Sequence, residues 1–244
     1  MGNKQFRDED LNRILAITLA RGGSKSVPKK NIKLLSGIPV IAHTIREALQ
    51  SNLINRYVVS TDDAEIQKIA LSYGADCPFL RPEKFATDTA SSVAALQHAV
   101  DWVEKEEGMK YDYVVELMAT NPLKRVDDID NCIKKLIDTS ADSVIAVHRL
   151  DDHHPARIKK IVDDRIVDFC VAEKLESRRQ DLTPDAYIRS GSIYALRRDH
   201  LMIQGQRYGS VESRPYILPP ERAVNIDSEI DFLIAEQLLE KREK

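Results

Sequence analysis

Cysteine is scarce in this sequence: Cys77, Cys132 and Cys170 are the only three among 244 residues. An odd number of widely spaced cysteines, with no C-x-x-C pair, argues against a disulfide framework. We therefore interpret the three side chains as reduced thiols that lie mostly in the core. The default location for such a chain is the cytoplasm.

Long apolar runs are also lacking, and so is a strong charge of one sign. No apolar run approaches the ~18 residues that a membrane-spanning helix needs. Residues 1–13 are polar and of mixed charge, without the apolar centre of a secretory signal. The net charge is only −3, which argues against a general nucleic-acid or membrane binder. We expect no nucleic-acid partner and no membrane association.

What the sequence does contain is short apolar runs that alternate with helical patterns. Strands are expected at 13–19, 56–60, 111–118, 142–148 and 191–201, and helices at 39–51, 63–74, 91–108, 126–139 and 228–241. This alternation indicates parallel βαβ units, whose ligands bind beyond the carboxyl ends of the strands. We expect a single α/β domain over 1–244, with a mostly parallel sheet flanked by helices.

The alternation breaks after about residue 150. Residues 157–170 are typical of a hairpin that turns at "VDDR", and residues 172–190 are polar and irregular. We interpret 150–190 as an excursion from the sheet and a candidate dimerisation arm. The alternative is a mobile surface insertion.

The loop after the first strand concentrates positive charge. Seven basic residues and no acidic residue lie between Asp10 and Glu47. In "LARGGSKSVPKKN", Gly22 and Gly23 would let the backbone approach a ligand closely. The position between a strand and a helix favours an anion, and lysine and arginine supply charge-assisted hydrogen bonds to phosphate. The loop therefore predicts an anion site, and a solvated basic turn is the alternative.

Neither of the two common phosphate-binding motifs is present in this loop. Lys25 lacks the upstream glycine spacing of G-x-x-x-x-G-K-[ST], and G-x-G-x-x-G does not occur. The loop instead resembles the first motif of the CMP-sugar synthetases, specifically the N-acylneuraminate cytidylyltransferases. Their pattern is close to LAR-x-x-SK-G-[IL]-P-x-KN, from which Ser26 departs because the pattern has glycine there.

This resemblance implies a Rossmann-like nucleotidyltransferase fold and a loop that wraps CTP. Arg21, Lys25 and Lys30 would contact the phosphates, and Asn31 would contact the nucleoside. Gly22 would belong to the same nucleotide site. Arg21 and Lys25 would act on the leaving pyrophosphate.

A second segment, "LRPEKFATDTASS" (80–92), is similar to the family stretch RP-x-x-x-A-x-D-[TS]-A-S-S. In that family this stretch lies against the cytosine ring. The resemblance implies nucleotide contacts from Arg81, Asp88, Thr89 and Ser91. Short polar side chains also cap helices, so a capping loop alone is the alternative.

A third segment, "LMATNPLK" (117–124), falls where the family usually has LQPTSPLR. The resemblance implies substrate contacts from Thr120 and Asn121. Two departures stand out: Met118 replaces a glutamine that would hydrogen-bond the substrate, and Lys124 replaces an arginine. A different acceptor sugar therefore remains open.

Two later segments, "HHPARI" (153–158) and "RRQDLTPDAYIRSGSIYA" (178–195), resemble the acceptor side of the same family. The resemblance implies that Arg157, Arg179, Gln180 and Arg189 face an α-keto acid sugar. The carboxylate of such a sugar suits bidentate arginine. The excursion would then help to bind the acceptor.

Two oxygen-bearing side chains occur in "AVNIDSEIDF" (223–232). On a strand, Asn225 and Asp227 would project to the same face, and paired oxygen ligands suit Mg²⁺. The family often has Asp-x-Asp here, so Asp227 is the stronger candidate ligand. Ser228 followed by Asp231 predicts a helix cap, and the structural alternative is that Asp227 only prepares the helix start.

Together these resemblances imply a cytidylyltransferase that transfers CMP from CTP to the anomeric hydroxyl of a sialic-acid-like 2-keto sugar acid and releases pyrophosphate. Arg21, Lys25 and Asp227 are the candidate catalytic residues, Mg²⁺ is the expected cofactor, and the resemblance implies a homodimer. Legionaminic acid, pseudaminic acid, 3-deoxy-octulosonate or a phosphonate are alternative acceptors, although "PKKN" argues against the octulosonate type. Because Asn225 stands where the family often has a carboxylate, a non-catalytic nucleotide-binding protein remains an alternative. The net charge disfavours a polyanion-binding surface protein.

Overall fold

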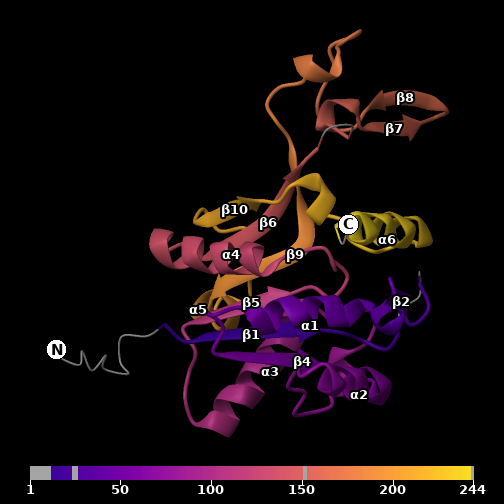
Figure 1. Cartoon of the computed structure of the whole chain (residues 1–244). Coiled ribbons are helices and arrows are strands. Elements are labelled where there is room, and N and C mark those ends of the chain that lie inside the picture. Colours follow the sequence, from indigo (N-terminus) through magenta and orange to yellow (C-terminus); the bar gives the residue numbers. More distant parts are fainter. Residues whose placement is uncertain (1–11, 24–26, 151–152, 243–244) are drawn as a thin grey trace, which may run out of the picture.

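The computed structural model describes residues 12–23, 27–150 and 153–242. Six strands form its central sheet: β1 (Ile14–Leu19), β4 (Arg56–Ser60), β5 (Tyr113–Leu117), β6 (Ser143–Arg149), β9 (Tyr187–Arg197) and β10 (Ser213–Ile217). Their order across the sheet is β10-β6-β9-β5-β1-β4 (Figure 1). All neighbouring pairs are parallel except those that β9 makes with β5 and β6. The predicted mostly parallel α/β sheet is confirmed.

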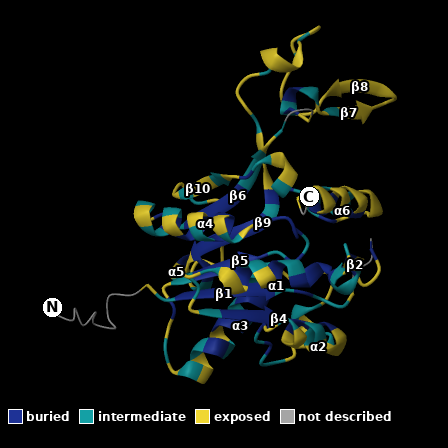
Figure 2. Cartoon of the chain, viewed as in Figure 1, coloured by how far each residue is buried: buried dark blue, intermediate teal, exposed yellow. Residues whose placement is uncertain are grey.

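Helices cover both faces of this sheet. They are α1 (Val40–Gln50), α2 (Ala64–Ser72), α3 (Ser92–Glu107), α4 (Val126–Thr139) and α5 (Arg198–Met202), whereas the last helix, α6 (Glu229–Arg242), packs elsewhere. Because side chains alternate along a strand, β1 sends Ile14 and Ala16 into a core with α1, α2 and α4. Leu15 and Ile17 enter a second core with α3 and α5. The strands β1, β4 and β5 are accordingly buried on both faces, whereas β10 at the edge of the sheet is largely exposed (Figure 2).

The helix ends follow from local capping residues. Asp63 accepts hydrogen bonds from two backbone N–H groups of the first turn of α2, and Ser91 accepts one in α3. Gly74 and Gly108 have φ angles of +88° and +66°, a backbone conformation that favours glycine after a helix. The predicted helix bounds therefore agree with the structure to within the cap residues. None of the helices in the described parts of the chain is long and apolar enough to cross a membrane.

The last helix packs against the beginning of the chain. A short hairpin of β2 (Leu34–Leu35) and β3 (Ile38–Pro39) precedes α1. A third apolar cluster joins it to α6 and consists of Leu35, Val40, Leu123, Ile226, Phe232, Ala235 and Leu239. This cluster places the segment before α6 beside the loop that follows β1.

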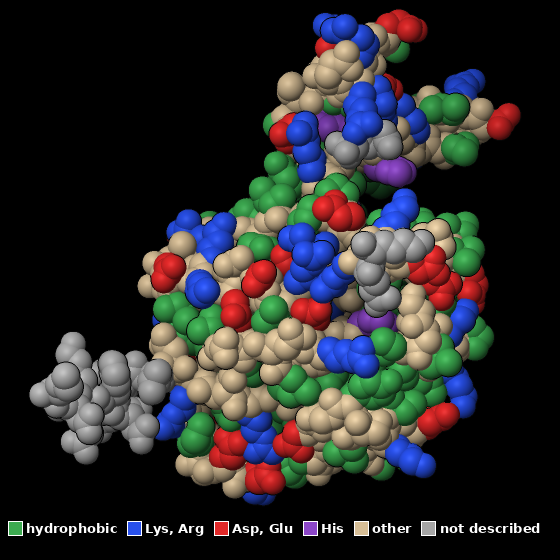
Figure 3. All heavy atoms as spheres, in the orientation of Figure 1, with side chains coloured by type: hydrophobic (Ala, Val, Ile, Leu, Met, Phe, Trp, Pro, Cys, Tyr) green, Lys and Arg blue, Asp and Glu red, His purple; other side chains and the backbone are tan. Residues whose placement is uncertain are grey.

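Residues 153–186 form an arm that stands away from the sheet (Figure 1). Its hairpin pairs β7 (Lys159–Val162) with β8 (Arg165–Asp168), as predicted, and turns at Asp163 and Asp164. Both turn residues have positive φ angles, +49° and +59°, as a two-residue hairpin turn requires. The arm presents both basic and apolar side chains on its surface (Figure 3).

Three sequence predictions differ from the structure. The strand expected at 191–201 begins earlier, at Tyr187, and ends at Arg197, because Leu201 folds back within α5 into the second core. β10 was not predicted, because Arg214 and Pro215 interrupt the apolar pattern expected of a strand. An edge strand tolerates such a proline. Residues 223–226 form no strand, so Asn225 and Asp227 do not owe their positions to a sheet.

Candidate functional site

A cavity of about 360 Å³ lies beyond the carboxyl ends of β1 and β5, and we call it the first cavity. It brings together residues of four of the six segments that the sequence assigned to the nucleotide, the substrate or the metal. The predicted site residues that line it are Arg21, Lys30, Asn31, Arg81, Asp88, Ser91, Thr120 and Asp227. Gly22, Thr89 and Asn121 are not part of this lining, and Lys25 lies outside the described residues.

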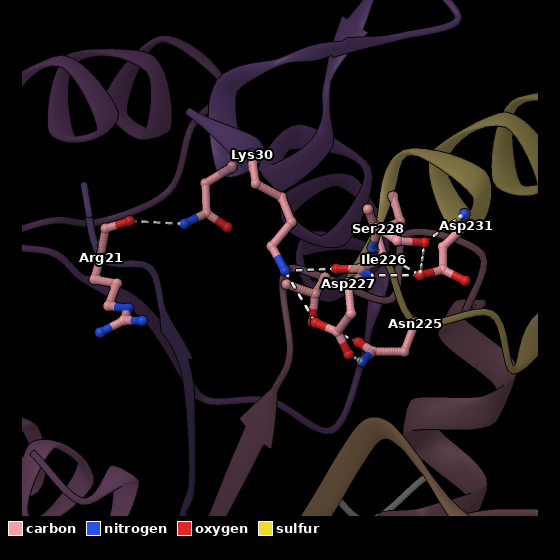
Figure 4. Close-up of polar contacts among 9 residues, drawn as sticks. Arg21, Lys30, Asn225, Ile226, Asp227, Ser228 and Asp231 are labelled. Carbon is pink, nitrogen blue, oxygen red and sulfur yellow. Dashed lines mark hydrogen bonds and ion pairs between the residues drawn. The ribbon is translucent and has the colours of Figure 1, made fainter. Parts of the chain in front are cut away.

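One wall of the first cavity joins the two ends of the chain through Lys30. This side chain is nearly buried, and its Nζ donates to the carbonyl oxygen of Ile226 at 2.5 Å. The same Nζ lies 3.1 Å from Oδ1 of Asp227 (Figure 4). The Asp227 side chain is 69% exposed, so this carboxylate remains open to the cavity.

Asn225 connects Asp227 to the loop after β5. Its Nδ2 donates to Oδ2 of Asp227 at 2.5 Å, and its Oδ1 accepts from Oγ1 of Thr120 at 2.7 Å. Ser228 and Asp231 form the predicted cap of α6, in which the Asp231 carboxylate accepts from the backbone of both Asp227 and Ser228. Within the described residues, no group of three or more His, Cys, Asp or Glu side chains could hold a metal ion.

The loop after β1 is held by polar contacts on both sides. Arg21 Nη1 lies 2.8 Å from Oδ1 of Asp88, which belongs to the predicted cytosine segment. Asn31 Nδ2 donates to the carbonyl oxygen of Arg21 at 3.0 Å (Figure 4). Asn31 therefore shapes the loop from within, in addition to lining the cavity.

The acidic pair that follows β4 was not predicted to belong to the site. The backbone N–H of Gly22 donates to Oδ1 of Asp62 at 3.2 Å, and Asp62 also lies 3.5 Å from the buried guanidinium of Arg81. A side chain at position 22 would meet Oδ2 of Asp63 at 2.5 Å. In this structure the neighbour that requires glycine is thus Asp63. In the sequence these two residues stand only at the start of the helix expected at 63–74.

A second cavity of about 630 Å³ shares Asp227 with the first. It is also lined by Asn225, Tyr194 and the predicted acceptor residue Arg189, whose guanidinium lies 4.1 Å from the ring centroid of Tyr208. Asp227 therefore borders both cavities. This arrangement allows a ligand in each cavity to approach the same carboxylate.

The other predicted acceptor residues lie in the arm. Arg179 and Gln180 line a separate cavity of about 330 Å³, together with His154. Arg157 donates from Nη2 to the carbonyl oxygen of Ser177 at 3.1 Å. The predicted acceptor residues are thus divided between the arm and the second cavity.

Lys124 holds the loop after β5 from the inside. Its fully buried Nζ donates to Oγ1 of Thr44 at 2.7 Å, to the carbonyl oxygen of Met118 at 2.8 Å and to that of Asn121. Burial lowers the pKa of Lys124 to about 7. Asn121 is buried as well, and its Oδ1 accepts from the hydroxyl of Ser192 at 3.0 Å. These two residues position Thr120 rather than line the cavity themselves.

The fold and the first cavity define a Rossmann-like nucleotidyltransferase architecture: cations and one late carboxylate converge beyond the carboxyl ends of parallel strands. The synthetase of CMP–2-keto-3-deoxy-manno-octonic acid, solved with CTP, has a TM-score of 0.68 and covers 95% of this chain and 100% of its own, at 18% identity. A 4-diphosphocytidyl-2C-methyl-D-erythritol synthase from Anaerococcus prevotii has a TM-score of 0.64 at 12% identity and covers 95% of this chain and 97% of its own.

The family model described as cytidylyltransferase matches residues 15–238. The chain therefore belongs to the cytidylyltransferase family, as the motifs predicted. It is 33% identical to a pseudaminic acid cytidylyltransferase from Campylobacter jejuni, over 92% of this chain and 95% of the relative. It is 31% identical to the CMP-N,N'-diacetyllegionaminic acid synthase of Legionella pneumophila, over 93% of this chain and 97% of that protein. Identity to N-acylneuraminate cytidylyltransferase A of Danio rerio is 33%, over 92% of this chain and 50% of that protein.

Proposed function

We propose that this protein transfers CMP from CTP to the anomeric hydroxyl of a sialic-acid-like 2-keto sugar acid and releases pyrophosphate. The observation that carries this proposal is that Arg21, Lys30 and Asp227 line one cavity, although they come from opposite ends of the chain. The relatives named for pseudaminic, legionaminic and N-acylneuraminic acid support an acceptor of this class.

In the proposed reaction, Arg21 and Lys30 hold the phosphates of CTP, and Lys25 joins them. Arg21 and Lys30 are each paired with a carboxylate, on Asp88 and Asp227, so the bound triphosphate supplies an alternative anionic partner. The oxygen of the anomeric hydroxyl bonds to the α-phosphorus in line and its proton passes to water, while the bond from this phosphorus to the oxygen that bridges to the β-phosphate breaks and pyrophosphate leaves. Positioning and charge neutralisation supply most of the acceleration.

We assign the metal site to Asp227, with Asn225 beside it. Mg²⁺ is bound through one or two carboxylates together with substrate phosphates and water, and an exposed carboxylate on the cavity wall fits this mode. When bound, the ion would neutralise charge on the phosphate oxygens. Asn225 holds the Asp227 carboxylate from one side while Lys30 contacts its other oxygen.

The second cavity is the proposed acceptor site. Arg189 lies in its lining and can bind a sugar carboxylate in a bidentate manner. Because Asp227 borders both cavities, an acceptor there would have its anomeric hydroxyl near the phosphates. Met118, which replaces the family glutamine that would hydrogen-bond the substrate, lines the first cavity. An acceptor that extends past Asp227 into this cavity would lack that polar contact, so we expect substituents that differ from those of N-acetylneuraminic acid.

We further propose a homodimer that uses the arm. Its hairpin exposes Ile161 and Ile166, which are 78% and 75% exposed, and Leu175 beyond it is 86% exposed. These two isoleucines are opposite each other in the β7–β8 pairing, so they form a continuous apolar patch that a second copy could cover. The three cysteines are unpaired, which fits the proposed cytoplasmic location, where CTP is available.

The test is pyrophosphate release from CTP and Mg²⁺ with a panel of acceptors: N-acetylneuraminic, legionaminic and pseudaminic acid, 3-deoxy-octulosonate and a phosphonate. We expect release with at least one nine-carbon acid, and loss of it in Asp227→Ala and Lys25→Ala. Glu229→Ala, at an exposed ion pair outside both cavities, is the matched control. Full activity in the first two variants would contradict the residue roles. CTP binding without turnover of any acceptor would favour the non-catalytic alternative.

A further inference from the structure

A carboxylate lies in an apolar layer of the sheet. Glu116 is fully buried on β5, and its Cα partners are Ile17 on β1 and Tyr194 on β9. Ile145 on β6 continues the same row beside Tyr194. Side chains opposite each other in a sheet share a face, so Glu116 is an ionisable side chain between apolar neighbours in the second core.

Only one of the two carboxylate oxygens of Glu116 has a partner. Oε2 accepts from Nη1 of Arg207 at 2.5 Å, whereas Oε1 has no hydrogen-bond partner among the described residues. Burial raises the pKa of Glu116, and Arg207 opposes this shift. A buried oxygen without a donor is destabilising. If packing alone had determined this position, leucine or methionine would fill it without that loss.

Glu116 also borders the reaction site. It lines the first cavity beside Met118. Its partner Arg207 lies over the ring of Tyr194, 4.8 Å from the centroid, and 6.0 Å from that of Tyr208. Because Tyr194 lines the second cavity, one continuous cluster extends from Glu116 to the proposed acceptor site.

We propose that Oε1 of Glu116 accepts a hydrogen bond from an N–H or O–H substituent of the acceptor sugar and thereby selects acceptors that carry a donor there. This inference rests on the proposed function and names the chemistry of one acceptor substituent. Arg207 is a positioning residue, because it holds the other carboxylate oxygen and opposes the rise in pKa that burial causes.

The neighbours of Glu116 favour the acceptor over the nucleobase as the donor. Tyr194 belongs to β9, which also supplies Arg189 to the second cavity, and Arg207 stacks against these same aromatic rings. The segment predicted for cytosine, 80–92, also lines the first cavity with Glu116, from the loop between β4 and α3. The contact of Arg207 with Tyr194 connects Glu116 to the acceptor side, and the nucleobase is the other source of a donor that the experiment tests.

The experiment compares the full chain with Glu116→Gln and Glu116→Asp in steady-state pyrophosphate release. Glutamine keeps an oxygen for Arg207 but removes the charge, and aspartate keeps the charge but withdraws the second oxygen. Glu104→Gln is the matched control, since Glu104 forms a similarly shielded pair with Arg198, at 2.7 Å, outside both cavities. The acceptors include analogues in which one N–H or O–H at a time is methylated, and N4,N4-dimethyl-CTP tests the nucleobase.

We expect both Glu116 variants to raise the acceptor KM roughly 10- to 100-fold, as for a lost hydrogen bond to a charged group, with the KM for CTP within about twofold. For one methylated acceptor, the KM with the wild type should rise by the same factor, and Glu116→Gln should not raise it further. An equal effect on all acceptors and on CTP, or a change in thermal unfolding alone, would overturn the inference. If dimethylation of the base in CTP, and no methylation of the acceptor, reproduces the loss seen in the Glu116 variants, the donor belongs to the nucleotide and the inference is overturned. Absence of any turnover by the wild type would instead contradict the proposed function itself.

Discussion

Lys30 and Asp227 are 197 residues apart in the chain, yet Nζ of the one lies 3.1 Å from Oδ1 of the other. The contact depends on the apolar cluster between α6 and the β2–β3 hairpin. The same Nζ donates to the carbonyl oxygen of Ile226, so a single cation fixes the segment before α6 and points toward the first cavity. The packing of α6 and the geometry of the site are therefore linked.

The first prediction concerns Lys30→Met. This substitution removes a buried cation and leaves the carbonyl oxygen of Ile226 without this donor. Because the proposed phosphate contact is lost as well, we expect kcat/KM for CTP to fall roughly 100- to 1000-fold. Lys33→Met is the matched control, because Lys33 joins the same two segments through Glu229, at 2.6 Å, on the protein surface. Exposed pairs contribute little, so we expect a change below about threefold. The measurement is kcat/KM for CTP in steady-state kinetics of both variants. Similar losses in the two would contradict a role for Lys30 at the phosphates.

The second prediction concerns the two adjacent glycines of the loop. A Cβ at position 22 would lie 2.5 Å from Oδ2 of Asp63, whereas a Cβ at position 23 would have no atom within 4 Å. Asp63 caps α2 through its other oxygen. We expect Gly22→Ala to lower the free energy of unfolding by about 0.5–2 kcal/mol, comparable to a lost cap, and to raise the KM for CTP. Gly23→Ala should do neither, and equal unfolding curves for the two variants would contradict this account.

Much of the fold could be predicted because its signals are local. Buried strands appear as continuous apolar runs, and Asp63, Ser91 and Gly108 mark the helix ends through capping chemistry that acts within a few residues. The loop after β1 was recognisable for the same reason, since its cations and glycines are adjacent in the sequence. The first cavity then follows from the parallel order of the strands.

Other features depend on residues that are distant in the sequence. Glu116 interrupts the run "YVVEL" as a single charge, and its meaning depends on Arg207, 91 residues later. Asp62 directly precedes the helix expected at 63–74, and only the fold brings it to Gly22. Pro215 obscured β10, whose pairing with β6 sets its strand character. Such contacts are determined by tertiary packing and carry no periodic signal.

The third prediction concerns the pH dependence of stability through Lys124. Burial lowers its pKa to about 7 in the folded protein, against 10.5 as the ordinary value. Between these pH values the unfolded chain binds more protons than the folded one, so the free energy of unfolding contributed by this residue increases as the pH rises. Below pH 7 the contribution no longer changes, because both states are protonated.

Lys124→Met tests this contribution. The variant also leaves the buried carbonyl oxygens of Met118 and Asn121 without this donor, so we expect it to be less stable than the wild type at pH 8 by about 1–3 kcal/mol or more. Urea unfolding at pH 7.5, 8.5 and 9.5 should show that the difference between the two proteins grows with pH, by at most about 1.4 kcal/mol per pH unit. A difference that stays constant or shrinks over this range would contradict the lowered pKa.

The last prediction concerns the arm. Ile161 and Ile166 are exposed and directly opposed on the hairpin, so Ile161→Asp should place a charge in the proposed dimer interface without disturbing the fold of the monomer. Light scattering should give twice 27.7 kDa for the wild type and a mass shifted toward the monomer for the variant. Leu71→Asp, at a 52% exposed position on α2, is the matched control and should remain dimeric. A monomeric wild type, or a variant as dimeric as the control, would show that the apolar hairpin does not hold two copies together.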